Sequence, residues 1–155
     1  MTHARMDTPL GPIGLRWEGE TLTGVDLEPD SDDRWIGNTT PPESVTRQLA
    51  QYFADGHGTF DLPLALTGTE FQRRVWSLMR AIPPGETRTY GSIASELGSA
   101  ARAVGQACRA NPLPIIVPCH RVVAAQGLGG FAGDTSGRKL AVKRWLLRHE
   151  GAQVR

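Results

Sequence analysis

A chain of 155 residues with a net charge of +1 and 39% hydrophobic residues can fold as one ordinary domain or two small ones without cross-links. Its two cysteines form no CxxC pair or Cys/His cluster, which excludes a disulfide framework and a structural zinc site and favours a reducing compartment. The sequence has no signal-peptide pattern and no apolar run of about 20 residues, so we expect a soluble, cytoplasmic protein without a membrane span.

Charge is distributed unevenly along the chain. Residues 1–65 hold four Lys/Arg and eleven Asp/Glu, a net charge of −7, whereas residues 66–155 hold 13 Lys/Arg and five Asp/Glu, a net charge of +8. A basic segment can be an ordinary solvated face or can pack on an acidic domain, but it also favours a polyanionic partner. We therefore predict an N-terminal domain, 1–65, and a C-terminal domain, 66–155.

The N-terminal domain has the pattern of a small α/β unit. Apolar and polar residues alternate on both sides of a turn at Gly19-Glu20, which predicts a β-hairpin over 11–27. An amphipathic helix is predicted behind Pro41-Pro42. Its apolar residues at helical spacing are Val45, Leu49, Tyr52 and Phe53. This domain contains no cluster of residues typical of a catalytic site, so we expect it to be a scaffold.

The C-terminal domain is predicted to be mostly helical. Thr69 can cap a first helix, which should end at Pro83-Pro84-Gly85. A short helix is expected over 90–97, followed by a third over 101–110 with Ser99 as its cap. The last two helices have the outline of a helix-turn-helix, with 101–110 as the recognition helix. In that helix Val104 and Cys108 should face inward, and the residues expected outside are Arg102, Gln106 and Arg109.

Cys119 has an unusual sequence context. It follows an apolar, strand-like run that begins at Asn111, and it stands between Pro118 and the dipeptide His120-Arg121. A lone cysteine is most often a small buried hydrophobic residue, an interpretation that suits Cys108 on the inward side of its helix. Cationic or ionisable neighbours instead lower the pKa of a thiol, so we expect Cys119 to form a nucleophilic thiolate.

The segment Pro118-Cys119-His120-Arg121-Val122 resembles the active-site signature of the methylated-DNA–protein-cysteine methyltransferases, also called O6-alkylguanine-DNA alkyltransferases. Further family-like blocks occur in the family's order across 70–151, and the segment from Thr8 to Pro12 resembles the family's opening strand. The blocks are Phe71-Gln72, Val75-Trp76, Ile82-Pro83, Gly85-Glu86-Thr87, Thr89-Tyr90, Ile93-Ala94, Ala101 to Gly105, Asn111-Pro112, Trp145 to Leu147 and His149-Glu150-Gly151. This resemblance implies a ribonuclease-H-like N-terminal domain and a winged helix-turn-helix C-terminal domain.

The resemblance also implies a function, direct-reversal DNA repair. An alkyl group would move irreversibly from O6-alkylguanine, or from O4-alkylthymine, to Cys119, once per molecule. Neither a cofactor nor a metal is implied. The implied partner is double-stranded DNA with an alkylated guanine, bound in the minor groove independently of sequence by a monomer, with cooperative binding left open.

Roles for individual residues follow from the same resemblance. Glu150 would orient His120, which would act through a water molecule to deprotonate Cys119. Tyr90 would protonate guanine N3, and Asn111 would tie the helix-turn-helix to the active-site segment. Backbone groups of Cys119 and Val122 would read the guanine edge, and Arg102 would fill the gap that a flipped nucleotide leaves. The other residues expected at the DNA are Ala101, Ala103, Gly105 and Arg109, and those expected at the alkyl pocket are Pro114, Val122, Phe131, Ala132 and Gly133.

Some positions depart from the family pattern. The spacing from Tyr90 to Arg102 is about two residues shorter than is usual, which predicts a tight turn between the two helices. Phe131-Ala132-Gly133 stands where a Tyr-Ser-Gly-like triplet is typical, so a hydroxyl and a hydrogen bond to O6 would be lost. The segment from Asp134 to Arg138 resembles an insertion. We expect methyl transfer to survive these changes, with the range of larger alkyl groups left open.

Three other functions are compatible with parts of the sequence. Alkyltransferase-like proteins flip damaged guanine and only flag it, but they have tryptophan in place of the cysteine. A winged-helix transcription factor would bury Cys119 and bind DNA sequence-specifically. A cysteine hydrolase would need oxyanion-type donors, and no glycine turn of that kind flanks Cys119.

Overall fold

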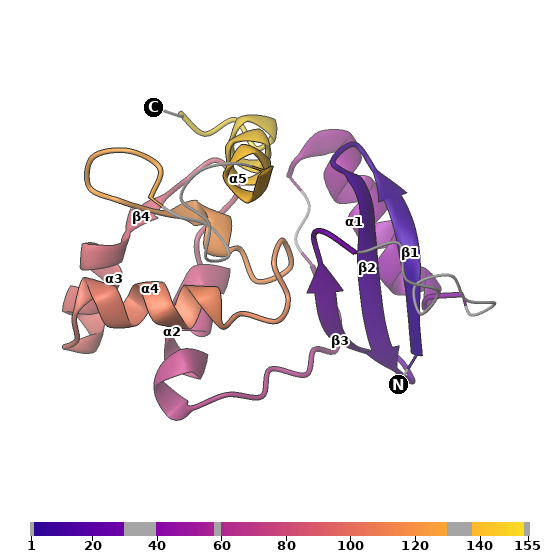
Figure 1. Cartoon of the computed structure of the whole chain (residues 1–155), viewed down its shortest axis with the longest axis horizontal. Coiled ribbons are helices and arrows are strands. Elements are labelled where there is room, and N and C mark those ends of the chain that lie inside the picture. The colour runs from indigo at the N-terminus through magenta and orange to yellow at the C-terminus, as the bar shows by residue number, and fades with distance from the viewer. Residues whose placement is uncertain (1, 30–39, 58–59, 130–137, 154–155) are drawn as a thin grey trace. The chain divides into compact units, whose positions relative to one another are not determined.

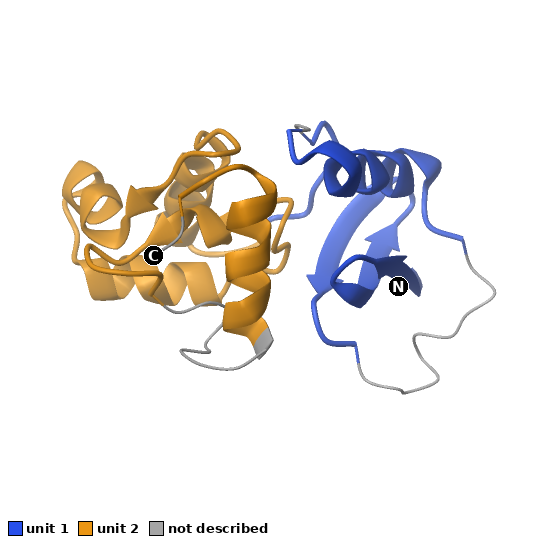
Figure 2. Ribbon diagram, turned by 90° about the horizontal axis from the view of Figure 1, so that it is seen from above, with its two compact units in different colours: residues 1–66 blue, residues 67–155 orange. Residues whose placement is uncertain are grey.

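The computed structural model describes residues 2–29, 40–57, 60–129 and 138–153. The chain divides into two compact units, Met1–Leu66 and Thr67–Arg155 (Figure 2). No helix within the described residues is long and apolar enough to cross a membrane.

Unit 1 is a three-stranded antiparallel sheet in the order β1-β2-β3 with one helix on its face (Figure 1). The strands are β1 (Thr2–Thr8), β2 (Gly11–Glu18) and β3 (Thr21–Asp26), and the helix is α1 (Glu43–Asp55). The predicted hairpin is confirmed as β2 and β3, and the predicted helix as α1. Their buried side chains form the core of the unit: Ile13, Leu15, Trp17, Leu22, Val25, Val45, Leu49, Tyr52 and Phe53.

The prediction for the segment from Thr8 to Pro12 was wrong in part. The opening strand lies earlier, over β1, and Thr8 is its last residue. The Thr8 hydroxyl donates to the Gly11 carbonyl (2.6 Å) and accepts from the Leu10 backbone N–H (3.1 Å). These two local hydrogen bonds favour a turn over a continued strand, so Pro9 and Leu10 connect β1 to β2.

Unit 2 begins with three helices that pack on one another (Figure 1): α2 (Glu70–Arg80), α3 (Tyr90–Leu97) and α4 (Ala101–Arg109). Thr69 caps α2 as predicted, in a capping box where the Thr69 hydroxyl accepts from the Gln72 N–H and the Gln72 side chain accepts from the Thr69 N–H. The Trp76 indole N–H of α2 donates to the Ala107 carbonyl of α4 (2.9 Å), which fixes these two helices side by side.

Only three residues connect α3 to α4, and the prediction that Ser99 caps α4 was wrong. Gly98 ends α3 with a φ of 63°, and the Ser99 backbone N–H donates to the Ala94 carbonyl (2.8 Å), so Ser99 closes the C-terminal turn of α3. The residue at the N-cap of α4 is Ala100, whose side chain cannot cap.

The rest of unit 2 contains the segment around Cys119. Residues 112–118 form turns, not the predicted strand-like run, because three prolines lack the N–H that a ladder needs and Ile115 has a φ of 76°. A one-turn 3₁₀ helix, η2 (Cys119–Arg121), follows. Next, β5 (Val122–Val123) pairs in parallel with β4 (Arg88–Thr89), and α5 (Arg138–His149) comes last.

Candidate active site

Cys119 is the first residue of η2 and is almost completely buried, with 4% of its surface exposed. Its backbone N–H donates to the Val117 carbonyl (2.8 Å), and the Arg121 N–H donates to the Pro118 carbonyl (3.0 Å). The chain therefore turns tightly at the cysteine.

Asn111 follows the C-cap residue of α4 and holds this turn. Its side-chain N–H donates to the Val117 carbonyl (2.8 Å), and its side-chain oxygen accepts from the Leu113 N–H (2.9 Å). The amide thus supplies hydrogen bonds in a proline-rich segment that forms no ladder. Asn111 also interacts with the Cys119 sulfur, which favours the thiolate.

His120, Arg121 and Glu150 form a buried ionic cluster. The His120 Nε2 atom lies 2.7 Å from Glu150 Oε2. Arg121 binds the same carboxylate with two donors, Nε to Oε1 (2.9 Å) and Nη2 to Oε2 (3.0 Å). Glu150 directly follows α5, so the cluster joins the end of that helix to η2. None of the three side chains is more than 7% exposed, and charge-assisted hydrogen bonds are strong in such an environment.

The protonation states of this cluster follow from its contacts. Hydrogen bonds from His120 and Arg121 outweigh the opposing effect of burial and lower the pKa of Glu150 to about 2, so the carboxylate is ionised at neutral pH. Burial is the main cause that lowers the pKa of His120 below its ordinary value, which keeps the imidazole neutral. A neutral imidazole that donates from Nε2 has an acceptor at Nδ1. The Nδ1 atom is buried and has no hydrogen-bond partner among the described residues.

The thiol environment corrects the prediction of a lowered pKa. Burial raises the pKa of Cys119, and this effect outweighs the opposing ones. The neighbours that suggested a thiolate act differently in the fold, because His120 is neutral and the Arg121 charge is bound to Glu150. The cation whose field lowers the pKa of the Cys119 thiol is instead Lys143, which is distant in sequence. Cys119 is therefore a thiol at rest and needs a base.

Lys143 is fully buried in the middle of α5. Its Nζ atom donates to the Val122 carbonyl (2.8 Å) and lies 5.7 Å from the centre of the Tyr90 ring. Burial lowers the pKa of Lys143 to about 8, although the fields of Cys119 and Cys108 oppose the shift. The ammonium thus links α5, β5 and the start of α3 around the cysteine.

Replacing Lys143 with methionine should change the pH dependence of stability. The unfolded chain keeps the lysine proton up to about pH 10.5, whereas the folded chain loses it at about pH 8. Between these two pH values the unfolded state binds more protons, so the contribution of Lys143 to the unfolding free energy increases as pH rises and decreases as pH falls. We expect the unfolding free energy of wild type minus that of Lys143→Met to increase by roughly 2–4 kcal/mol from pH 8 to 10.5. Urea unfolding across this range measures it. Lys139→Met, on the same helix, should not alter the wild-type curve, and equal slopes for all three proteins would contradict the assignment.

Tyr90 is half-buried at the first position of α3. Burial, helped by the fields of the two cysteines, raises its pKa well above the ordinary value, so the phenol keeps its proton at any pH near neutrality. Gly129 approaches the ring closely, since a Cβ atom at that position would lie 2.9 Å from Tyr90 Cε2. Gly129 also has a φ of 72°, so both the space and the backbone conformation favour glycine there.

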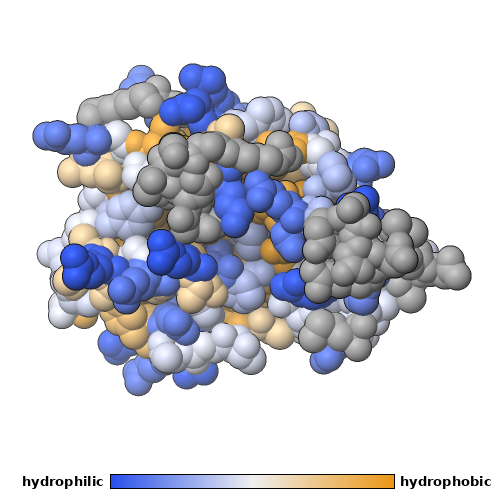
Figure 3. Space-filling view, in the orientation of Figure 1, coloured by the Kyte–Doolittle hydropathy of each residue, from blue (hydrophilic) through white to orange (hydrophobic). Residues whose placement is uncertain are grey.

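Apart from Tyr90 on α3, the residues predicted at the DNA lie on α4. As expected, Val104 and Cys108 are buried, whereas Arg102, Gln106 and Arg109 are exposed. Ala101 is exposed as well, and Ala103 and Gly105 are partly covered. Hydrophilic residues with smaller apolar areas between them cover the visible surface of α2 to α4 in Figure 3. The arginine side chains of α4 are therefore on a side of the helix that does not pack into the core of the unit.

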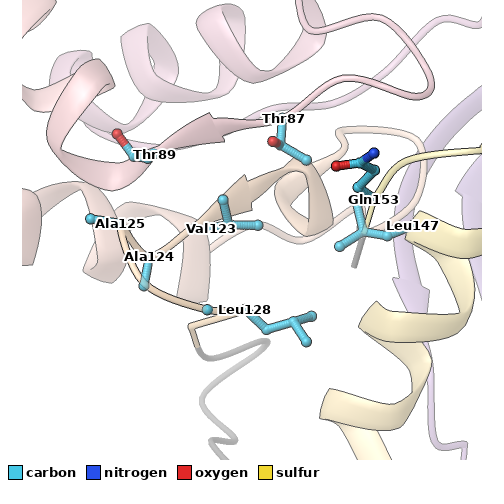
Figure 4. Close-up of a pocket in the computed structure, with 9 residues that line it drawn as sticks. Thr87, Thr89, Val123, Ala124, Ala125, Leu128, Leu147 and Gln153 are labelled. Atoms are coloured by element: carbon cyan, nitrogen blue, oxygen red, sulfur yellow. The ribbon is translucent and has the colours of Figure 1, made fainter. Parts of the chain in front are cut away.

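The residues predicted at the alkyl pocket are only partly described. Val122 and Pro114 are buried, and Phe131, Ala132 and Gly133 lie outside the described residues. A pocket of about 260 Å³ is present nearby, but its lining includes neither Val122 nor Cys119 (Figure 4). It contains Val123, whose side chain points to the opposite face of β5 from that of Val122. The lining residues are Thr87, Thr89, Val123, Ala124, Ala125, Gly127, Leu128, Leu147 and Gln153.

Two residues of the site were not predicted as parts of it, Arg121 and Lys143. The sequence gives Arg121 a place in the motif but no partner, and Lys143 has the helical context of an ordinary surface lysine. The position of Lys143 on the apolar side of α5 could have indicated its burial, since Val142, Lys143, Leu146 and Leu147 are buried together.

Cys108 is buried beside Met79, with 3.6 Å between the sulfur atoms. Burial raises its pKa to about 12, so it stays a protonated, buried thiol, which agrees with the expectation of a small buried residue. The described residues contain no group of three or more His, Cys, Asp or Glu side chains that could hold a metal ion.

Comparison with known proteins agrees with this geometry. The family described as 6-O-methylguanine DNA methyltransferase matches with its ribonuclease-like domain over residues 1–66 and with its DNA binding domain over 70–152. The methylated-DNA–protein-cysteine methyltransferase of Methanosarcina acetivorans is 44% identical over 160 residues, which cover 98% of this chain and 99% of the relative. That of Mycobacterium leprae is 45% identical, covering 99% and 95%.

Solved structures give the same result. The crystal structure of Mycobacterium tuberculosis O6-methylguanine methyltransferase matches with a TM-score of 0.84 and 39% identity, covering 97% of this chain and 92% of that one. The crystal structure of Mycobacterium tuberculosis OGT in complex with DNA matches with a TM-score of 0.80 and 40% identity, covering 97% and 93%. The predicted architecture is confirmed at the level of a ribonuclease-like N-terminal domain and a DNA-binding C-terminal domain. With both domains and nearly the whole length matched, the chain belongs to the 6-O-methylguanine DNA methyltransferase family.

Proposed function

We propose that this chain is a methylated-DNA–protein-cysteine methyltransferase that repairs DNA by direct reversal. It transfers the alkyl group of O6-alkylguanine, and of O4-alkylthymine, to Cys119 irreversibly, once per molecule. The observation that carries the proposal is the buried series of Glu150, His120 and Cys119, in which the His120 Nδ1 atom is left as an acceptor. The names of the relatives support the same reaction.

The proton of the thiol leaves first. Glu150 accepts the Nε2–H of His120 and so fixes the tautomer whose Nδ1 can take a proton. A water molecule passes the Cys119 proton to Nδ1, which produces a thiolate and an imidazolium beside a carboxylate. The Lys143 ammonium and the Asn111 amide stabilise the thiolate. Because burial raises the pKa of the thiol, this assisted transfer is needed at neutral pH.

The displacement then takes place in one step. The Cys119 sulfur attacks the alkyl carbon, the carbon–O6 bond breaks, and its electron pair leaves with guanine. Tyr90 keeps its proton at neutral pH and can give it to guanine N3, which makes the base a better leaving group. Backbone groups of Cys119 and Val122 read the guanine edge. The Val122 carbonyl already accepts from Lys143, but a carbonyl oxygen can accept a second hydrogen bond.

DNA is bound by residues 66–155, with residues 1–65 as the scaffold. The family's DNA binding domain and the related complex with DNA support this partner. We assign α3 and α4 to a helix-turn-helix whose helix α4 enters the minor groove as part of a monomer. Ala101, Ala103 and Gly105 allow close approach because they are small, and Arg109 contacts phosphate. Binding therefore depends on salt and little on sequence.

Replacing Arg102 with alanine should slow repair of duplex DNA more than repair of single-stranded DNA. Arg102 is exposed on α4 and would fill the space left by the extruded nucleotide, which costs a few kcal/mol to unstack only in a duplex. We expect a loss of roughly tenfold or more in the rate of transfer from duplex, and a smaller loss from a single strand. Arg109→Ala is the matched control, since loss of a phosphate contact should weaken binding to both substrates and reduce the salt slope by about 0.9 for the duplex and about 0.7 for the single strand. Equal losses on both substrates for Arg102→Ala would contradict intercalation.

The alkyl pocket is assigned to Pro114, Val122, Phe131, Ala132 and Gly133. Pro114 and Val122 are buried and apolar, which suits an alkyl group. Because phenylalanine and alanine stand at 131 and 132 in place of hydroxyl-bearing residues, the O6 atom receives fewer hydrogen bonds from this side. Methyl transfer survives, since the displacement depends on Cys119 and on protonation of the base.

The proposed function is tested by intact mass. The protein is incubated with a duplex oligonucleotide that contains one O6-methylguanine, beside an otherwise identical unmodified duplex. We expect a gain of one methyl group, about 14 Da, that saturates at one per chain. Proteolytic mapping should place the methyl group on the peptide that contains Cys119 and leave Cys108 unmodified.

The other outcomes identify the alternatives. No gain of mass with tight, lesion-selective binding would indicate a protein that only flags damage. No gain and no preference for the lesion would favour a transcription factor. Repeated conversion of substrate by one protein molecule would indicate a turnover enzyme, such as a hydrolase, in place of a single-use acceptor.

A further inference from the structure

Arg121 connects three separate parts of unit 2. Its Nε and Nη2 atoms donate to the two carboxylate oxygens of Glu150, at 2.9 and 3.0 Å. Its Nη1 atom donates to the carbonyl of Ile82, which follows the C-terminal end of α2, at 2.6 Å. With 6% of its surface exposed, the residue is in no position to bind phosphate. Two of its three hydrogen bonds go to the carboxylate that holds His120, and the third goes to the backbone just after α2.

We propose that Arg121 is a positioning residue of the alkyl transfer: it fixes the Glu150 carboxylate so that Glu150 can hold His120 as the base. This inference rests on the proposed function and extends it to a residue that does not contact the reacting atoms. Arg121 acts only through Glu150 and His120 and does not touch the substrate.

Geometry is the first reason. A carboxylate held by His120 alone could rotate about its last two bonds, because one hydrogen bond does not fix the plane of the group. The paired donors of a guanidinium match both oxygens and set that plane, and the Ile82 carbonyl fixes the guanidinium in turn. Glu150 Oε2 is then held on the His120 Nε2–H, so Nδ1 remains the acceptor.

Charge is the second reason. The groups that act on His120 are Glu150 at the end of α5, Arg121 beside it on η2 and Lys143 within α5. Glu150 raises the pKa of His120, whereas Arg121 and Lys143 lower it. The Arg121 charge thus offsets that of Glu150 and keeps the imidazole neutral before the reaction. A base that is already protonated cannot accept the thiol proton.

The test compares the rate of methyl transfer as a function of pH in wild type, Arg121→Met and Arg121→Lys. We expect Arg121→Met to react roughly 10- to 100-fold more slowly at neutral pH, the loss typical of removing a partner that orients a working histidine. Its loss of activity in acid should also begin at higher pH, because the pKa of His120 rises when the positive charge is removed. Arg121→Lys keeps the charge but not the paired donors, so it should react slowly with the acid limb near that of wild type.

A double-mutant cycle with Glu150→Gln separates positioning from a merely structural role. If Arg121 acts through Glu150, adding Arg121→Met to Glu150→Gln should reduce the rate less than threefold further, about 0.65 kcal/mol. This pair also removes both buried charges, so it serves as the readable variant if Arg121→Met alone fails to fold. Rates are taken from the reacting fraction, and duplex binding is measured separately.

Two results would overturn the proposal. One is an acid limb that stays at the wild-type pH in Arg121→Met with a normal rate in the reacting fraction, as expected for a residue that only stabilises the fold. The other is a rate loss in the double variant that equals the product of the losses in Arg121→Met and Glu150→Gln. Wild-type protein runs in every experiment, so its failure to accept a methyl group would reject the proposed function itself, whereas transfer by wild type with either result above rejects only the role of Arg121.

Discussion

A Cys119→Ser protein is expected to gain no methyl group from O6-methylguanine DNA, while it binds that DNA as tightly as wild type. Serine has nearly the size of cysteine, so the tight turn of η2, the 2.8 Å hydrogen bond to the Val117 carbonyl and the buried surroundings should persist. A hydroxyl is a far weaker acid and nucleophile than a thiol, and burial already opposes ionisation at this position. The rate should fall by roughly 10⁴-fold or more.

The second cysteine provides the matched control. Cys108 is buried beside Met79, and burial raises its pKa to about 12. Cys108→Ser should therefore accept one methyl group at the wild-type rate in the fraction that folds. Intact mass over time, with binding of a lesion duplex measured on the same preparations, checks both proteins. A methyl group on the Cys119→Ser chain would show that another residue is the acceptor.

The local elements of this fold could be predicted because their signals are local. Thr69 and Gln72 form the capping box that begins α2, and Gly98 ends α3 because glycine adopts positive φ at little cost. The inward positions of α4 follow from helical spacing, as Val104 and Cys108 show. Each of these outcomes depends on side chains only a few residues apart.

The failures share the opposite property. Residues 112–118 have strand-like composition, but their prolines and the positive φ of Ile115 exclude a ladder, and the Asn111 amide provides the hydrogen bonds instead. Ser99 has the residue type of a cap, but its backbone N–H is already used to close α3. In both cases a competing hydrogen bond decides the structure, and a residue-type pattern does not show which bond forms.

The electrostatics of the site were the least predictable from sequence. Adjacent cationic groups suggested a thiolate at Cys119, but Arg121 is 29 residues from the glutamate that binds its charge, and Lys143 comes from a helix that looks ordinary. The series of cysteine, histidine and glutamate came from the family resemblance. The structure adds the distances, the burial and the pairing of charges in the site. The properties of Cys119 therefore depend on residues that the fold brings together from distant parts of the chain, more than on its neighbours in the motif.

Replacing His120 with glutamine tests whether the imidazole is the base. The glutamine amide can place an N–H near the position of Nε2 and keep the hydrogen bond to Glu150, but it has no basic atom at the position of Nδ1. We expect methyl transfer at neutral pH to be roughly 10² to 10⁴-fold slower, the usual contribution of general-base catalysis.

The pH dependence of this loss separates a base from a structural histidine. As pH rises toward the pKa of the Cys119 thiol, which burial places above its ordinary value, hydroxide can remove the proton and the variant should approach wild type. His149→Gln is the matched control, because His149 precedes Glu150 in sequence and stacks on Trp145 with 4.5 Å between the ring centres, away from the carboxylate contact. It should react at the wild-type rate. Since a histidine that merely fills space would leave a loss that is the same at every pH, a constant ratio of the two rates from neutral to alkaline pH would reject His120 as the base and leave the buried thiol to ionise without it.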